Sequence, residues 1–316
     1  MFALRGIAVS FSVLVIVYGV LSLAVAASWS KVGLRIGVHP ARRIADWLFA
    51  LRMFPLVAAA AVTLALAVPS FLLLEPRTID EPLGAIPLAL GACGVLLGIL
   101  GTVNAATALR RAARGVAACT QGAQLVESAA ALPVLRIVRP LPAMTVAGIL
   151  RPRVLLSEAA EVLLTPGELR TALNHEVAHV ARRDNLKKLV FRLVPFPAMR
   201  SLEAAWLEAI EMAADDAAVS DAGEALDLAA ALIKLARLGP PETPMDLTAA
   251  LVHNPASAVN ARVERLIAWS AERQVTPLEH SPRYTLGAGL VVLCAFAAAY
   301  SQLLVQVHAA TEWLVR

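Results

Sequence analysis

Charged residues are scarce in this chain. Asp, Glu, Lys and Arg make up only 16% of its 316 residues, and 59% are hydrophobic. Ordinary soluble domains are roughly 25% charged and about 45–50% apolar. The shortage of charge therefore disfavours a soluble protein and favours a membrane protein. The basic residues cluster beside apolar runs instead of along a soluble face, so nucleic acid is not an expected partner.

Cysteine is scarce as well. The three cysteines, Cys93, Cys119 and Cys294, form no Cys-x-x-Cys pair. This spacing excludes a disulfide framework and a zinc knuckle built on cysteine. The three cysteines are therefore expected to be small buried hydrophobic residues.

Long apolar runs are abundant. Four stretches, about 7–27, 53–74, 82–109 and 285–310, reach the roughly 20 residues that a transmembrane helix needs. The alternative, buried helices of a large soluble protein, explains less well why basic residues flank these runs. Lys and Arg concentrate after the first and third runs, which predicts that those segments face the cytoplasm. They are Lys31, Arg35, Arg42, Arg43 and Arg52, then Arg110, Arg111 and Arg114.

The first run has a competing interpretation as a cleaved signal peptide. Arg5 would be its basic start, and Ala24-Val25-Ala26 is similar to a cleavage site. Its apolar core exceeds the roughly 7–15 residues of a signal peptide, and the next segment is basic. Retention is therefore favoured, with an outside N-terminus and region 110–283 in the cytoplasm. Cleavage would place that region outside.

Region 110–283 begins with strand patterns. Segments 134–138, 144–149 and 153–157 are rich in β-branched or apolar residues and are separated by turn signals, which predicts a small antiparallel sheet. A helix follows. Thr165 supplies an N-cap, Pro166 the first helical position and Glu168 the third, which together form a capping-box pattern.

This helix carries the pattern His175-Glu176-x-x-His179. Residues four apart lie on one helical face, so both imidazoles can reach one metal ion. Glu176 can reach a water molecule bound to that ion and act as general base. The pattern predicts one Zn²⁺ per chain, with His175 and His179 as ligands.

The next predicted helix, about 201–220, offers a third ligand. Glu208, Glu211 and Asp215 share one face, and no Lys or Arg lies between Glu203 and Asp221 to neutralise them. We expect Glu211 to complete the three protein ligands of a catalytic zinc, with Glu208 as the stronger rival and Asp216 as the weaker one. Asp215, one turn after Glu211, can orient a ligand histidine through its free ring nitrogen.

A later helix, about 257–273, closes the region. Its apolar spacing predicts that Val263, Leu266 and Ile267 point inward and that Arg262 and Arg265 point outward.

These motifs together resemble the BlaR/MecR-type membrane zinc metallopeptidases, which are gluzincins related to HtpX. The similarity lies in segment 174–185, in Glu211 to Asp215, in the strand-turn-strand of 148–157 and in Arg262 to Ile267. It implies a mostly α, polytopic membrane protein with four transmembrane helices and a cytoplasmic α+β gluzincin domain between helices 3 and 4. The expected parts are residues 1–109, 110–283 and 284–316.

The resemblance implies a zinc endopeptidase of the bacterial inner membrane that cuts a cytoplasmic or membrane-proximal protein in signalling or regulation. Only about six residues follow the fourth run, so the penicillin-binding sensor of the best-known members is expected to be absent. The activating signal is then expected to come from the transmembrane spans themselves or from a regulatory membrane partner. The alternative function is a non-catalytic signalling or scaffold protein with a structural zinc, but no fourth protein ligand is evident.

Overall fold

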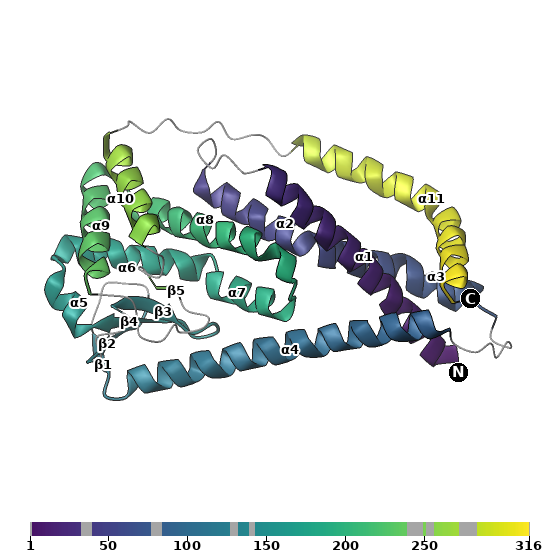
Figure 1. The fold of residues 1–316 in the computed structure, drawn as a ribbon. Helices are drawn as coiled ribbons and strands as arrows, with labels where there is room; N and C mark the ends of the chain where they lie inside the picture. Colours follow the sequence, from purple (N-terminus) through teal and green to yellow (C-terminus); the bar gives the residue numbers. More distant parts are fainter. Residues whose placement is uncertain are drawn as a thin grey trace.

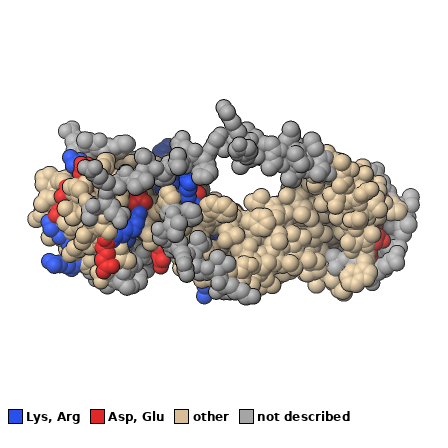
Figure 2. All heavy atoms as spheres, turned by 90° about the horizontal axis from the view of Figure 1, so that it is seen from above, with Lys and Arg blue, Asp and Glu red and all other residues tan. Residues whose placement is uncertain are grey.

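The computed structural model describes residues 2–32, 40–76, 84–126, 132–138, 143–238, 249–250, 256–271 and 283–315. Arg35, which belongs to the predicted basic segment, lies outside these ranges. The chain is mostly helical (Figure 1). Long apolar helices form one end, and a small sheet with shorter helices forms the other. Charged side chains gather at the end that holds the sheet, whereas few are seen at the end formed by the long apolar helices (Figure 2).

Three helical stretches are long and apolar enough to cross a membrane. They are Phe2–Trp29 in α1 (Phe2–Val32), Ala41–Leu74, and α4 (Ala85–Thr120). Less than a third of the most apolar part of each is buried within the chain, at 28%, 28% and 22%. The remaining apolar surface needs another apolar environment, which a bilayer supplies. By their length and composition, these three helices support the prediction of a membrane protein.

The second stretch begins earlier than its apolar run. It comprises α2 (Ala41–Val62), a π-helical turn (Thr63–Ala67) and α3 (Val68–Leu74). The polar residues Arg42, Arg43 and Arg52, which the sequence suggested for a connecting segment, therefore belong to α2 itself.

The predicted fourth run falls in a single helix, α11 (Arg283–Val315). Its Tyr300 hydroxyl donates to the carbonyl oxygen of Ala65 in the π-helical turn, at 2.9 Å. This carbonyl lies where the backbone pattern of α2 is interrupted, so a partner from another helix satisfies it. That α11 crosses a membrane stays a prediction.

The sheet has five short strands in the order β1-β2-β4-β3-β5. They are β1 (Gln124–Val126), β2 (Val134–Ile137), β3 (Met144–Ala147), β4 (Arg153–Ser157) and β5 (Ala249–Ala250). The prediction of a wholly antiparallel sheet was wrong, because β2 and β4 pair in parallel while the other three pairs are antiparallel. β3 and β4 form a hairpin, and the buried β4 returns to the centre of the sheet beside β2.

Helix α6 (Pro166–Ala181) packs on this sheet, and further helices lie around the two (Figure 1). They are α5 (Glu158–Leu163), α7 (Asp184–Leu193), α8 (Arg200–Ala218), α9 (Ala222–Ala236) and α10 (Ala256–Ala271). The main core joins β2–β4 to α6, α9 and α10 through buried Val, Leu and Ala side chains. At the start of α6, Thr165 and Glu168 form the predicted capping box.

The predicted faces of α10 were partly wrong. Arg262 is buried, with 4% of its surface exposed, whereas Ile267 is 50% exposed. Arg265 is only about one-third exposed at its side chain, and it contacts Asp216. Apolar spacing places an arginine outside by default, but a carboxylate on another helix can hold it inside.

Candidate metal centre

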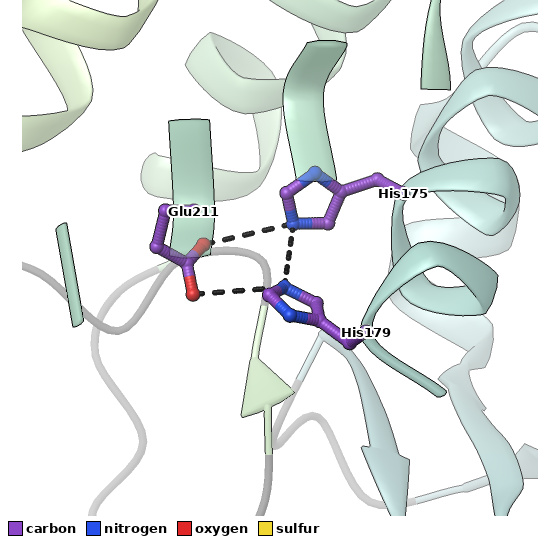
Figure 3. A group of neighbouring side chains, drawn as sticks. All are labelled: His175, His179 and Glu211. Atoms are coloured by element: carbon purple, nitrogen blue, oxygen red, sulfur yellow. Dashed lines mark hydrogen bonds and ion pairs between the residues drawn. The ribbon is translucent and has the colours of Figure 1, made fainter. Parts of the chain in front are cut away.

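Helices α6 and α8 bring His175, His179 and Glu211 together (Figure 3). The two histidine Nε2 atoms lie 3.1 Å apart. Glu211 Oε2 lies 3.6 Å from His175 Nε2, and Glu211 Oε1 lies 3.6 Å from His179 Nε2. All three side chains are buried. The group could hold a metal ion.

The donor set fits zinc in chemistry and in size. Zinc binds imidazole nitrogen at about 2.0–2.1 Å in tetrahedral geometry, which places two such nitrogens about 3.3 Å apart. The observed 3.1 Å is close to that value. Two imidazoles and one carboxylate are also a known ligand set for catalytic zinc.

The rival ligands lie elsewhere. Glu208 is exposed on α8 and is not part of the cluster. Asp216 pairs with Arg265 of α10. Of the three candidates on α8, Glu211 is therefore the one that lies near the Nε2 atoms of both histidines.

Two further carboxylates hold the far side of each imidazole. Asp215 Oδ1 lies 2.9 Å from His175 Nδ1, and Asp184 Oδ2 lies 2.8 Å from His179 Nδ1. Both aspartates are fully buried. A carboxylate on Nδ1 fixes the ring and its tautomer, so each Nε2 lone pair points toward the space between the ligands.

Asp184 was missed in the sequence, although it lies only five positions after His179. Helix α6 ends at Ala181, and Arg183 then adopts a left-handed conformation with φ of 55°. This residue ends α6 and redirects the chain, and the first residue of α7, Asp184, then reaches Nδ1 of His179. Sequence spacing alone does not show such a turn, because a non-glycine residue rarely adopts positive φ.

Arg262 was also missed as a site residue. Its Nε and Nη2 donate to Oδ2 and Oδ1 of Asp215 at 2.8 and 2.6 Å, and its Nη1 donates to Glu211 Oε2 at 3.1 Å. This forked contact is the geometry in which arginine binds a carboxylate most strongly. Burial opposes ionisation of Asp215, but the charge of Arg262 outweighs it and holds the pKa of Asp215 below its usual range.

Glu176 lies on the same helix as the histidines and is fully buried. Its Oε2 accepts a hydrogen bond from the backbone N–H of Val146 in β3, at 2.8 Å. Its Oε1 has no hydrogen-bond partner among the described residues. Burial raises the pKa of Glu176 to about 8, so this group is poised to exchange a proton near neutral pH.

The ligands themselves have shifted pKa values. Burial lowers the pKa of His175, but hydrogen bonds with Asp215 and Glu211 outweigh burial and raise it to about 9. Burial also lowers the pKa of His179, and there it prevails. For Glu211, burial opposes ionisation, but the two histidines and Arg262 bring its pKa to about 2. Glu211 is thus ionised and ready to bind a cation at neutral pH.

No protein-family model matches this chain, and no curated protein matches it. The case for a function therefore rests on the chain's own residues.

Proposed function

We propose that this protein is a membrane-anchored, zinc-dependent endopeptidase. The observation that carries the proposal is Glu176, a buried carboxylate one residue from a metal-binding histidine, with one oxygen held by β3 and the other unpartnered among the described residues. A zinc ion held by His175, His179 and Glu211 would supply a bound water of pKa about 7 and polarise a peptide carbonyl.

The chain's own groups have separate roles in this proposal. The Val146 N–H fixes the Glu176 carboxylate, so Oε1 can take a proton from the attacking water and later give it to the leaving amine. Asp215 and Asp184 keep the two imidazoles oriented. Glu211, with its depressed pKa, remains an anionic ligand at neutral pH.

The resemblance to BlaR/MecR-type gluzincins supports the same reaction and suggests its setting. In this proposal the protein lies in a bacterial inner membrane with the metal centre on the cytoplasmic side. Its substrate is a cytoplasmic or membrane-proximal protein, and the outcome is a signalling or regulatory cleavage.

A second candidate is a non-catalytic membrane protein with a structural zinc. It is favoured by the burial of the ligand set, because His175, His179 and Glu211 are only 0%, 2% and 9% exposed. Structural zinc usually has four protein ligands, and the cluster supplies three among the described residues.

Replacing Glu176 with Gln separates the two candidates. The variant keeps the side-chain shape and the Val146 contact but removes the base. Purified full-length Glu176→Gln protein should retain one zinc per chain, measured by elemental analysis, and lose peptide cleavage by at least about 100-fold. A wild-type protein that holds zinc and cleaves no member of a peptide library would favour the structural role.

A further inference from the structure

The helical stretch made of α2, the π-helical turn and α3 is too long for a membrane span alone. The stretch Ala41–Leu74 has 34 residues, or about 51 Å of helix, whereas the hydrocarbon core of a bilayer is about 30 Å thick. Its charged residues, Arg42, Arg43, Asp46 and Arg52, all lie in the first 12 positions. The first part of α2 (41–52) therefore projects from the apolar region.

This projecting part lies along α8, the helix that carries Glu211 (Figure 1). Its inner face shares a buried cluster with α7 and α8. The cluster includes Ile44, Ala45 and Leu48 from α2, and Phe191, Trp206 and Ile210 from the other two helices. Ile210 immediately precedes Glu211, so α2 packs against the backbone that places the third ligand.

Arg52 joins the same helices at their other end. Its side chain is only 1% exposed. Nε donates to Glu203 Oε1 of α8 at 2.8 Å, and Nη2 donates to the carbonyl oxygen of Val194 at the end of α7. The guanidinium carbon also lies 5.4 Å from the centre of the Phe191 ring. One side chain of α2 thus fixes the junction between α7, which carries Asp184, and α8.

Asp46 makes a second, charged connection. Its Oδ1 lies 3.2 Å from Arg182 Nη2 and 3.7 Å from Lys187 Nζ. The same two cations lie 3.7 and 3.8 Å from Oδ1 of Asp184. Asp184 in turn holds Nδ1 of His179. Asp46 is therefore connected to His179 by a chain of ion pairs: Asp46 contacts Arg182 and Lys187, and these two cations lie near the carboxylate of Asp184. Asp184 contacts His179 directly.

We propose that the projecting part of α2 positions the metal ligands, with Arg52 and Asp46 as the positioning residues. Arg52 acts on Glu211 through α8, and Asp46 acts on His179 through Asp184. The affinity of the metal centre for Zn²⁺ then depends on how α2 packs against α7 and α8. This inference rests on the proposed metal centre, and it extends that centre to a helix more than 100 positions away in the sequence.

The test uses full-length protein in detergent or nanodiscs, with Zn²⁺ affinity measured by chelator competition. Arg52→Gln and Asp46→Asn should each weaken Zn²⁺ binding by up to about tenfold, the lower end of the loss that follows when a group in direct contact with a metal ligand is changed. Arg52→Lys should restore only part of the loss, because lysine cannot bridge Glu203 and Val194 as a planar fork does. Arg43→Gln, a matched charge loss on an exposed position of α2, should leave the affinity unchanged.

A second readout separates positioning from general stability. Co²⁺ in place of Zn²⁺ has an absorption spectrum that reports ligand geometry, and it should change in Arg52→Gln and Asp46→Asn but not in Arg43→Gln. If Arg52→Gln does not fold, Asp46→Asn and Glu203→Gln decide, because both sites are partly exposed. Folded variants with wild-type Zn²⁺ affinity and a wild-type Co²⁺ spectrum would overturn the positioning role of α2 but not the proposed function. A wild-type protein that binds neither ion would overturn the proposed function as well.

Discussion

At the scale of single residues, four buried carboxylates surround two imidazoles. Glu176, Asp184, Glu211 and Asp215 are all less than a tenth exposed. Such a concentration of negative charge is costly unless cations compensate it. Arg262 supplies one positive charge by direct contact with two of the four, and Arg182 and Lys187 lie near Asp184. A divalent metal between the histidines would supply two more positive charges.

Replacing Arg262 with Gln should therefore destabilise the metal-free protein. Removing one partner of a buried ion pair costs about 3–5 kcal/mol, because the other charge is left uncompensated. The free energy of unfolding of full-length protein should fall by about that amount, and added Zn²⁺ should recover part of it. Arg265→Gln is the matched control on the same helix, since its partner Asp216 is partly exposed and away from the histidines. Equal losses in both variants would contradict the account.

Metal binding should depend on pH through His175. Since the pKa of this imidazole is raised to about 9, His175 carries a proton at neutral pH, and a metal ion must displace it. A raised pKa favours the protonated form below about pH 9, so Zn²⁺ affinity should rise by up to about tenfold per pH unit and level off above that value. Metal-buffered titrations between about pH 6.5 and pH 8.5 check this. An affinity that is constant over that range would exclude proton displacement.

At the scale of elements, local patterns were predicted well. The capping box at Thr165 depends only on neighbouring residues, and the structure has it. Helical spacing places His175 and His179 on one face of α6, and Glu211 of α8, expected from its unpaired acidic face, does lie with them. What could not be predicted depends on contacts between distant segments. Arg262 enters the site only because α10 packs on α8 and α9, and β2 pairs with β4 in parallel only because the β3–β4 hairpin folds back.

The apolar helix α4 packs against α7, and substitutions of two glycines in α4 can test this packing. A Cβ atom at Gly101 would overlap with the carbonyl oxygen of Leu193, whereas one at Gly98 would meet no described atom within 4 Å. Gly101→Ala should lower the thermal stability of the full-length protein, at a cost of about 1–3 kcal/mol for overpacking. Gly98→Ala should not lower it. Identical melting temperatures for the two variants would argue against this docking.

At the scale of the whole molecule, charge separates two ends. The apolar helices α1, α2 and α4 carry most of their side chains outward at one end, and the ionisable groups concentrate at the other (Figure 2). With these helices in a bilayer, the candidate metal centre would lie near the membrane surface. The basic residues Arg110, Arg111 and Arg114 favour the cytoplasmic side for that end.

This orientation predicts the result of an accessibility assay. A tag inserted near the exposed N-terminus of α9, beside Glu224, should be protected from an external protease or label in intact cells and become reactive after permeabilisation. Labelling at that site in intact cells would show that this end faces outward, and it would support cleavage of the first apolar run.

The central claim is peptide hydrolysis at the site of His175, Glu176, His179 and Glu211. The most direct measurement compares new protein N-termini across the proteome in cells that express the wild-type chain or Glu176→Gln at equal levels. A set of N-termini should appear with the wild-type chain and be absent with Glu176→Gln, although both proteins hold zinc. Identical N-termini in the two cultures would contradict the central claim.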